Sequence, residues 1–160
     1  MEHETNIPKY DPNAAPVLDI NGIKKLLPHR PPFLMVDRII EMGEDYVVGI
    51  KTIGVNEWYF NGHFPEEPVV PGVLLIEAMA QVGGILVLNS VDEPERYSTY
   101  LAKIDNAKFK RKVIPGDVVV FKLTITNPLR RSIVSMNGKA YVGDTLVCES
   151  DMVAQVIKNR

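Results

Sequence analysis

The sequence predicts an α+β domain in which an antiparallel sheet wraps around one long buried helix. The first observation behind this prediction is an apolar segment that begins at Pro71 and ends at about Leu88. Its only polar side chains are Glu77 and Gln81, and a helix that is apolar on nearly every side is expected to be buried. The second observation is the alternation of apolar and polar residues in much of the chain after residue 98, which is typical of half-buried strands. Strands that follow one central helix are expected to curl around it.

The N-terminal region is expected to lie outside this sheet. Residues 1–16 are polar and contain several prolines, which predicts a flexible arm before a single domain of residues 17–160. Asp19 can cap a short helix, and Pro28 ends it.

Strands are predicted on both sides of the central helix. Before it, residues 33–41 and 46–53 are predicted strands, joined by a hairpin turn at residues 43–45. After it, the alternating segments are residues 119–126, 134–142 and 145–156. The sheet they form is expected to leave an edge free for another subunit.

The helix itself has signals at its start and in its middle. Pro71 suits the first helical position, where its missing N–H has no partner to lose. The pair Gly83 and Gly84 lowers helix propensity but permits close packing of the backbone.

Composition excludes several classes of function. The 160 residues fit one domain, and a formal net charge of −2 disfavours nonspecific nucleic-acid binding. Cys148 is the only cysteine, which excludes an internal disulfide, and three histidines make a multi-histidine metal site unexpected. The N-terminus lacks the apolar core of a signal peptide, and the apolar segment is too short to span a bilayer. We therefore expect a cytoplasmic protein with no membrane span and no metal.

His63 and Glu77 are the candidate acid–base residues. His63 follows Gly62 in a loop that three prolines stiffen, and a rigid loop suits a precisely aimed catalytic group. Glu77 carries a carboxyl group in apolar surroundings. Burying its charged form costs several kcal/mol unless a partner compensates the charge, and a neutral carboxyl group avoids this cost. Burial would raise its pKa and keep a proton available for donation. The alternatives are that His63 merely packs in its loop and that Glu77 hydrogen-bonds to a backbone group or to Gln81.

Gly72 is the third candidate because it lies at the start of the predicted helix. The first helical turn offers free N–H groups that can stabilise a carbonyl oxygen gaining negative charge. Alternatively, Gly72 only allows the chain to enter the helix. A base, an acid and an oxyanion donor together suit the removal of a proton beside a carbonyl with loss of a β-leaving group. Elimination of water from a β-hydroxyacyl thioester would use all three.

Three ordered motifs resemble those of the FabZ-type (3R)-hydroxyacyl-[acyl-carrier-protein] dehydratases. They are LLPHRPPFLMVDR at residues 26–38, the block that contains GHFP at 62–65 and PGVLLIEAMAQ at 71–81, and KIDNAKFKR with VIPGD between residues 103 and 117. The similarity covers about residues 20–156. Pro31 departs from the pattern, since an aromatic residue commonly follows Arg30 in this family; the difference lies outside the catalytic block.

The resemblance implies a hot-dog fold, in which the sheet wraps the long helix, and a reaction that needs no cofactor. It implies that His63 is the base at the α-carbon and that Glu77 assists departure of the hydroxyl as water. The Gly72 N–H would hold the thioester carbonyl. The resemblance also implies that His63 and Glu77 of one site come from opposite subunits of a dimer, with three dimers forming a hexamer. The product would serve fatty acid synthesis and the acyl precursors of lipid A.

Other residues are candidates for binding the acyl chain and its carrier. Tyr100 falls where the family often has an aromatic residue at the tunnel mouth, although it could equally pack at a strand edge. Phe60 is expected to pack against the helix or to line the acyl tunnel. Acyl carrier protein is acidic, so a basic cluster is a candidate docking site, with a solvated strand face as the alternative. The cluster contains Lys108, Lys110, Arg111 and Lys112, aided by Arg130 and Arg131. His29 and Arg30 are expected to be structural, at a subunit contact.

Three alternatives to a free-standing dehydratase remain. A hot-dog thioesterase would use the carboxylate to activate water. A noncatalytic acyl-binding module would need neither His63 nor Glu77. The chain could also be the dehydratase domain of a fusion with a deacetylase of lipid A synthesis. A glutamate at position 77, where the related isomerising dehydratase has aspartate, favours dehydration without isomerisation.

Overall fold

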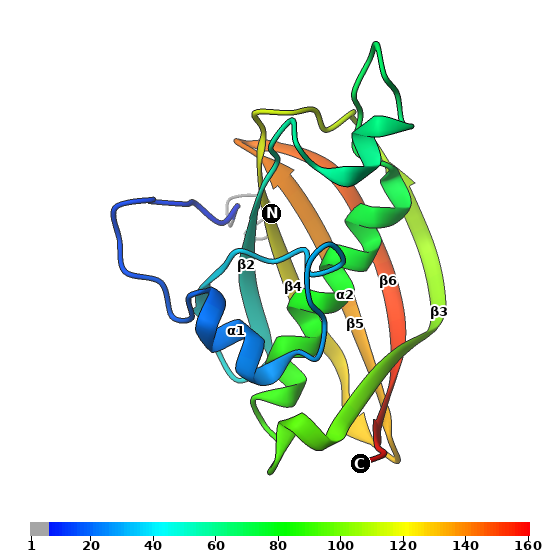
Figure 1. Cartoon of the computed structure of the whole chain (residues 1–160). Helices are drawn as coiled ribbons and strands as arrows, with labels where there is room; N and C mark the ends of the chain where they lie inside the picture. The colour runs from blue at the N-terminus through cyan, green and yellow to red at the C-terminus, as the bar shows by residue number, and fades with distance from the viewer. Residues whose placement is uncertain (1–6) are drawn as a thin grey trace.

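The computed structural model describes residues 7–160 and contains one six-stranded antiparallel sheet with a long helix across it (Figure 1). The strands are β1 (Arg38–Met42), β2 (Tyr46–Thr52), β3 (Tyr97–Phe109), β4 (Val118–Arg130), β5 (Ile133–Val142) and β6 (Thr145–Lys158). The helices are α1 (Ile20–Leu26) and α2 (Gly72–Leu88), with short 3-10 helices at Trp58–Asn61 and Pro94–Arg96. The sheet order is β1-β2-β4-β5-β6-β3.

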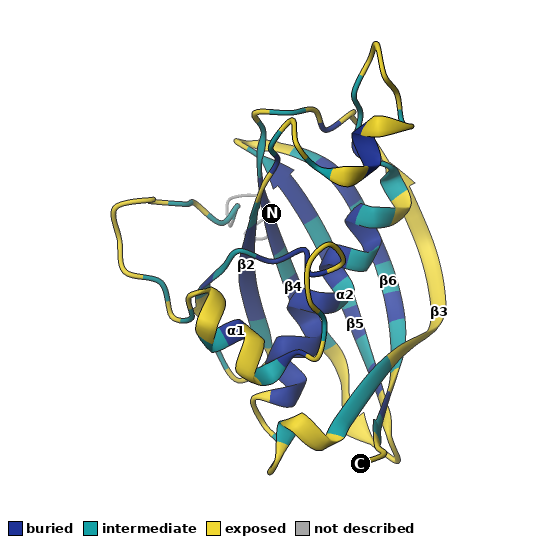
Figure 2. Cartoon of the chain, in the orientation of Figure 1, coloured by how far each residue is buried: buried dark blue, intermediate teal, exposed yellow. Residues whose placement is uncertain are grey.

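The predicted α+β fold is confirmed, and α2 lies on the inner face of the curved sheet (Figure 2). The helix contacts β2, β4, β5 and β6, and most of its side chains from Leu75 onward are buried. Two close approaches allow this packing. A Cβ on Gly83 would collide with the Sδ atom of Met136, and one on Gly138 would lie 2.8 Å from the Sδ atom of Met79. The predicted role of the helix glycines in close packing is therefore confirmed at Gly83.

The start of α1 agrees with expectation, and the start of α2 differs from it by one residue. Asp19 caps α1 as predicted, because its Oδ1 accepts a hydrogen bond from the Gly22 N–H at 2.9 Å. For α2, Pro71 is the residue before the first helical residue, so Gly72 rather than Pro71 occupies the first position.

The predicted start of the first strand, at residue 33, was wrong. Residues 33–37 form a turn and an extended loop, and β1 begins only at Arg38. The reason is tertiary: the side chain of Gln81 binds the carbonyl of Phe33 and the N–H of Met35, which directs this backbone toward α2. The second strand agrees with its prediction, and β1 and β2 pair as a hairpin.

The N-terminal residues that the structure describes run beside the sheet. Leu18 pairs with Ile39, so the outer edge of β1 is partly covered. Tyr10 packs against a second apolar cluster of Val48, Ile50 and Val120, and its hydroxyl accepts a hydrogen bond from Arg38 at 3.1 Å. Residues 1–6 of the predicted arm lie outside the described residues, and the flexibility of the arm stays a prediction. Among residues 7–160, no helix is long and apolar enough to cross a membrane.

The other edge of the sheet is β3, which pairs only with β6 among the described strands. Most of its length is exposed (Figure 2). Its exposed residues include the large apolar side chains of Tyr100, Leu101, Ile104 and Phe109. Such an edge offers unpaired backbone groups together with apolar surface.

Candidate functional site

The backbone around His63 fixes which ring nitrogen carries the proton. The His63 Nδ1 atom lies 2.7 Å from the carbonyl oxygen of Val69. A carbonyl can only accept, so Nδ1 donates, and in the neutral tautomer the lone pair is on Nε2. Backbone hydrogen bonds from His63 N to Tyr59 O and from Val69 N to His63 O hold the loop on both sides. In the neutral form of the ring, the proton is therefore on Nδ1 and Nε2 is the nitrogen that can act as a base.

His63 and Gly72 line the same open groove, which has a volume of about 510 Å³. Gly72 is the first residue of α2, so its N–H has no acceptor within the helix. The absence of a side chain matters here, because a Cβ on Gly72 would lie 2.7 Å from the ring of Phe109. The predicted base and the predicted oxyanion donor thus share one groove.

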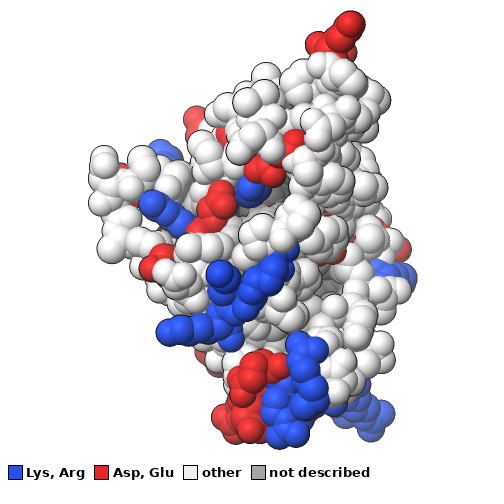
Figure 3. Space-filling view, viewed as in Figure 1, with Lys and Arg blue, Asp and Glu red and all other residues white. Residues whose placement is uncertain are grey.

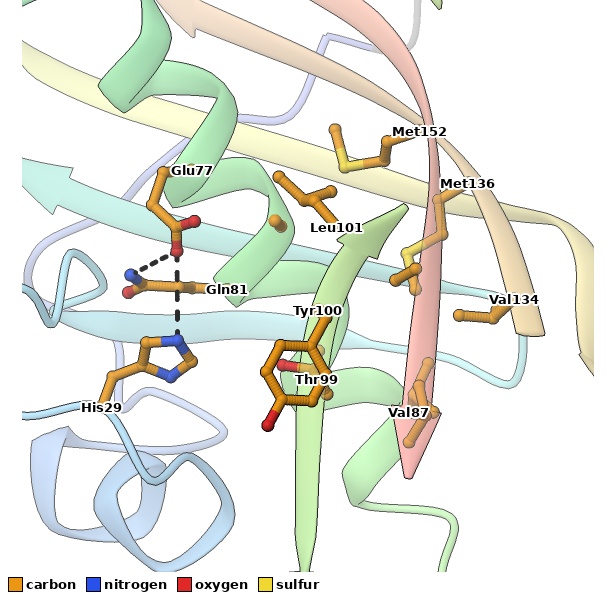
Figure 4. A pocket seen from close by; sticks show the side chains of 14 residues that line it. His29, Glu77, Gln81, Val87, Thr99, Tyr100, Leu101, Val134, Met136 and Met152 are labelled. Carbon is orange, nitrogen blue, oxygen red and sulfur yellow. Dashed lines mark hydrogen bonds and ion pairs between the residues drawn. The ribbon is translucent and has the colours of Figure 1, made fainter. Parts of the chain in front are cut away.

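Glu77 lies on α2 and points into a different, narrower cavity of about 50 Å³ (Figure 4). Its side chain is 22% exposed, and its Oε2 accepts a hydrogen bond from the Nε2 of Gln81 at 3.0 Å. The anticipated alternative, a bond to Gln81, is therefore present. It leaves Oε1 available, so the bond does not exclude a chemical role for the carboxyl group.

The cavity below Glu77 is apolar. Methionine, valine and alanine side chains from α2, β5 and β6 make up half of its lining residues (Figure 4). Among the lining residues are Val87, Val134, Met136, Met152, Ala154 and Val156. Tyr100 on β3 lines it too and is 53% exposed, as a residue at a mouth would be. An acyl chain is the kind of ligand that such a narrow apolar space suits.

Phe60 behaves differently from Tyr100. It is buried, and its ring packs edge-on against that of Tyr59, with 4.7 Å between the ring centroids. Neither of the two cavities is lined by it. The packing role fits this position, and a contact with the acyl chain stays a prediction.

Within the single described chain, His63 and Glu77 line separate cavities, and no hydrogen bond or ion pair joins them among residues 7–160. Each is near a different part of the predicted machinery. His63 lines the groove with Gly72, the predicted oxyanion donor, whereas Glu77 lines the apolar cavity. The expectation that the two meet across a subunit boundary stays a prediction.

A second polar neighbour of Glu77 in its own chain, after Gln81, is His29, for which the sequence predicts a structural role. The His29 Nε2 atom lies 4.0 Å from Glu77 Oε2 (Figure 4). Burial lowers the pKa of His29, with Glu77 opposing and Arg30 reinforcing this effect. The sequence held a signal in the LLPHRPPF motif, but spacing alone could not place residue 29 beside residue 77.

The predicted basic cluster is only partly brought together. Lys110, Arg111 and Lys112 line the groove that contains His63, but acidic side chains accompany the cluster. The nearest charged pairs are Lys108 and Lys110 with Glu149 at 3.9 and 4.0 Å, Arg111 with Asp117 at 3.7 Å, and Lys112 with Glu67 at 2.9 Å.

Arg130 and Arg131 lie elsewhere. The turn that contains Arg131 is next to Ile133, and Ile133 pairs with Gln155 on β6. On its other side, Gln155 pairs with Tyr100 of β3. Lys108 of β3 instead pairs with Glu149, at a different position along β6. The two arginines are therefore near the opposite end of β3 from Lys108. Basic side chains also gather over α1, which contributes Lys24 and Lys25 (Figure 3). Positive charge by itself does not single out one docking surface.

No group of three or more His, Cys, Asp or Glu side chains that could hold a metal ion occurs in residues 7–160. Cys148 is buried in the core and unpaired.

In a comparison with known families, residues 27–151 match the FabA-like domain. The chain is 51% identical over 140 residues to the 3-hydroxyacyl-[acyl-carrier-protein] dehydratase FabZ of Geotalea uraniireducens, covering 86% of this chain and 95% of that protein. It is 44% identical to the corresponding protein of Solibacter usitatus, covering 88% and 86%.

Longer proteins are also similar. The chain is 60% identical over 158 residues to the bifunctional enzyme LpxC/FabZ of Bacteroides thetaiotaomicron. That match covers 99% of this chain but 34% of the relative, so the chain spans about a third of the bifunctional relatives that it matches.

Solved structures share the fold. The dehydratase heterocomplex ApeI:P from Xenorhabdus doucetiae has a TM-score of 0.68 at 16% identity, covering 83% of this chain and 89% of that chain. A thioesterase from Haemophilus influenzae has a TM-score of 0.57 at 20% identity, covering 76% and 78%. Similarity at these identities concerns the architecture alone, and it confirms the predicted hot-dog fold.

Proposed function

This chain belongs to the FabA-like family and, within it, to the relatives of the FabZ dehydratases, and we propose that it dehydrates (3R)-hydroxyacyl-[acyl-carrier-protein] to the trans-2-enoyl product. The observation that carries the proposal is the free Nε2 of His63 in the groove that also holds the N–H of Gly72. A base beside an oxyanion donor suits abstraction of a proton next to a carbonyl.

In the proposed reaction His63 Nε2 removes a proton from the α-carbon of the thioester. The C–H electron pair becomes the new C=C bond, and the bond from the β-carbon to its hydroxyl breaks. Glu77 donates a proton to the departing hydroxyl, which leaves as water. The Gly72 N–H stabilises the negative charge that develops on the thioester oxygen. Return of the proton from His63 to Glu77, directly or through water, restores the starting state.

The surroundings of His63 and Glu77 support these roles. The Val69 carbonyl, which accepts the Nδ1–H of His63, also stabilises the imidazolium that forms when Nε2 takes a proton. The apolar cavity beside Glu77 suits the acyl chain and limits water. No step requires a cofactor.

The proposed site needs two subunits. His63 of one chain and Glu77 of another form each site, and two such sites form per dimer. The exposed β3 edge supports this proposal, since its apolar residues and unpaired backbone suit a second copy. A trimer of such dimers is the proposed hexamer, which sedimentation at several concentrations would test.

Acyl carrier protein is the proposed partner. Lys110, Arg111 and Lys112 at the His63 groove favour docking there, where the carried thioester would reach the base. We place the reaction in the cytoplasm, and the free thiol of Cys148 is compatible with a reducing compartment. The product would enter fatty acid synthesis.

A fused form is a second proposal, because the 60% identity to the LpxC/FabZ protein covers 99% of this chain. In that case the domain described here would supply the dehydratase activity, and its product would serve lipid A acyl precursors as well.

The test is a direct assay. Purified protein is given a (3R)-hydroxyacyl thioester, and the conjugated enoyl product is followed by its ultraviolet absorbance. His63→Ala and Glu77→Gln should each lower kcat by about 10²-fold or more. Wild-type turnover by both variants would refute the mechanism. Release of free thiol without an enoyl product would indicate a thioesterase, and binding without turnover would indicate an acyl-binding module.

A further inference from the structure

We propose that His29 is a positioning residue for Glu77, whose Nε2–H holds the Oε2 side of the carboxyl group so that Oε1 is directed at the substrate hydroxyl. The inference rests on the proposed dehydration for its effect on rate, but its geometry can be tested without any activity.

The loop that carries His29 is clamped to α2 by Gln81. The amide of Gln81 is 1% exposed and makes three hydrogen bonds. Its Oε1 accepts from Met35 N at 2.7 Å, while its Nε2 donates to Phe33 O at 2.8 Å and to Glu77 Oε2 at 3.0 Å. One side chain therefore fixes the loop and the carboxyl group relative to each other.

The backbone of His29 is held from the other side by Arg30. The guanidinium group donates to the carbonyl oxygens of His29 at 2.7 Å, Leu27 at 2.8 Å and Lys24 at 3.0 Å. These bonds satisfy carbonyl groups at the end of α1 and close the turn that presents the imidazole. The ring of His29 also stacks on that of Phe33, with 6.2 Å between centroids and 19° between planes. His29 thus has little freedom to leave Glu77.

The surroundings of the ring indicate its tautomer. Nδ1 is buried and has no hydrogen-bond partner among the described residues, whereas Nε2 faces Glu77 Oε2 at 4.0 Å. A proton on Nδ1 would leave a buried donor unpaired and would turn a lone pair toward the carboxylate. A proton on Nε2 turns an N–H toward the carboxylate and leaves only a lone pair at Nδ1. Burial lowers the pKa of His29, which favours this neutral form; the charged groups that act on it are Glu77 and Arg30.

Both polar contacts of Glu77 are made with the same oxygen. Oε2 faces the N–H groups of Gln81 and His29, so a proton carried by Glu77 is favoured on Oε1. The 4.0 Å separation from His29 is longer than a hydrogen bond, so its effect in the free chain is electrostatic orientation. A closure of about 1 Å would make it a hydrogen bond, and contacts at catalytic sites often tighten in this way when substrate binds.

The activity-independent test is nitrogen NMR of the histidine side chains at pH 7.5. The chain has only three histidines, and the loss of signals in His29→Phe assigns those of His29. We expect His29 to carry its proton on Nε2, and Glu77→Gln to shift its Nε2 resonance. A proton on Nδ1 would overturn the proposal even if the enzyme is an active dehydratase.

The kinetic test compares His29→Phe, which keeps an aromatic ring, with His29→Gln, which keeps an N–H donor. His29→Phe retains the stack on Phe33 and should lower kcat about 10- to 100-fold with KM within about threefold, the range seen when supporting groups of a site are removed. His29→Gln can donate an N–H and should recover part of kcat. In the Glu77→Gln background, His29→Phe should have little further effect because the group it positions is already changed.

A merely structural role for His29 would give different results. It would lower the unfolding midpoint and reduce activity by the same factor with or without Glu77→Gln. Wild-type kcat in a folded His29→Phe protein would also overturn the proposal. If no variant or wild-type protein dehydrates any thioester, the proposed function fails, and the NMR result still decides the geometry.

Discussion

At the scale of single residues, the chemistry depends on which atom of each side chain the fold leaves free. The Val69 carbonyl accepts the Nδ1–H of His63 and leaves Nε2 as the proposed base. Gln81 donates to Oε2 of Glu77 and leaves Oε1 free. In both cases a neutral group, a backbone carbonyl or a side-chain amide, determines which atom stays free. No additional charged group has to be buried to arrange the site.

His29 should make the stability of the protein depend on pH in a defined window. Burial lowers its pKa below the ordinary value of 6.5, so the unfolded chain binds the proton more tightly than the folded one. The contribution of His29 is complete above pH 6.5 and is lost as the pH falls toward its folded pKa. Urea unfolding of wild type and His29→Gln at fixed protein concentration from pH 8 to pH 5 measures this. The free-energy difference between wild type and variant should fall below pH 6.5; a constant difference would contradict the assignment.

Cys148 should be chemically inert in the folded protein. It is 0% exposed, and burial, with a smaller contribution from Glu149, raises the pKa of its thiol to about 11. At pH 8 only about one thiol in a thousand would then be ionised, and the thiolate is the reactive form. Ellman's reagent should therefore label the native protein very slowly and release about one equivalent of dye in denaturant. Stoichiometric labelling of the native protein within minutes would be incompatible with this environment.

At the scale of elements, α2 both fills the core and carries the site. Its N-terminus presents Gly72, its first turns carry Glu77 and Gln81, and its C-terminal half is buried under the sheet. The hydrophobic packing that fixes α2 therefore also fixes the distance, within one chain, between Gly72 and Glu77, which we propose to be the oxyanion donor and the acid.

The adjacent glycines of α2 provide a matched pair for testing this packing. Alanine gains up to about 1 kcal/mol over glycine in a helix interior at either position. At Gly83 the added methyl group would displace the side chain of buried Met136, and overpacking costs about 1–3 kcal/mol, so Gly83→Ala should be less stable than Gly84→Ala. At Gly84 it would meet only Leu27, at an ordinary 3.6 Å, so Gly84→Ala should be neutral or stabilising. Chemical denaturation measures both, and equal stabilities for the two variants would refute the packing.

How much of this could be predicted from the sequence differs between elements and contacts. The central helix was predictable because its apolar run has no polar face, and the later strands because their alternation is local. The start of β1 was not, because Gln81 binds the backbone of residues 33 and 35 from a distant part of the chain. The approach of His29 to Glu77 has the same origin. Such contacts depend on tertiary structure, which local patterns do not encode.

The candidate site shows the same division. His63, Gly72 and Glu77 could be selected from residue type, loop stiffness and helix position. The tautomer of His63 could not, because it depends on the Val69 carbonyl six residues away in a folded loop. The grouping of Arg130 and Arg131 with the other basic residues was suggested by charge, and strand pairing separates them.

At the scale of the whole molecule, one edge of the sheet is partly covered and the other is exposed. Leu18 pairs beside β1, whereas β3 is exposed and carries large apolar side chains. His63 and Glu77 line different cavities of one chain, and we propose that the exposed β3 edge binds the second copy that brings them together. A second copy is needed, in our account, to bring the base of one chain to the acid of the other.

Complementation between two inactive variants tests this central claim most directly. His63→Ala and Glu77→Gln are mixed in equal amounts, dissociated and reassembled, and the dehydration rate is compared with that of each variant treated alone. In a mixed two-fold dimer one site combines both altered residues and the other combines both wild-type residues. Because about half of the dimers are mixed and each has one intact site, the mixture should recover about a quarter of wild-type activity.

Subunit exchange is verified independently with differently tagged variants, and a tagged mixture of two His63→Ala samples serves as the inactive control. Recovery of about a quarter of the wild-type rate, with the control inactive, is the result that a shared site predicts. If mixed dimers form and the rate stays at the sum of the two variants alone, His63 and Glu77 do not act across the subunit boundary and the account is contradicted.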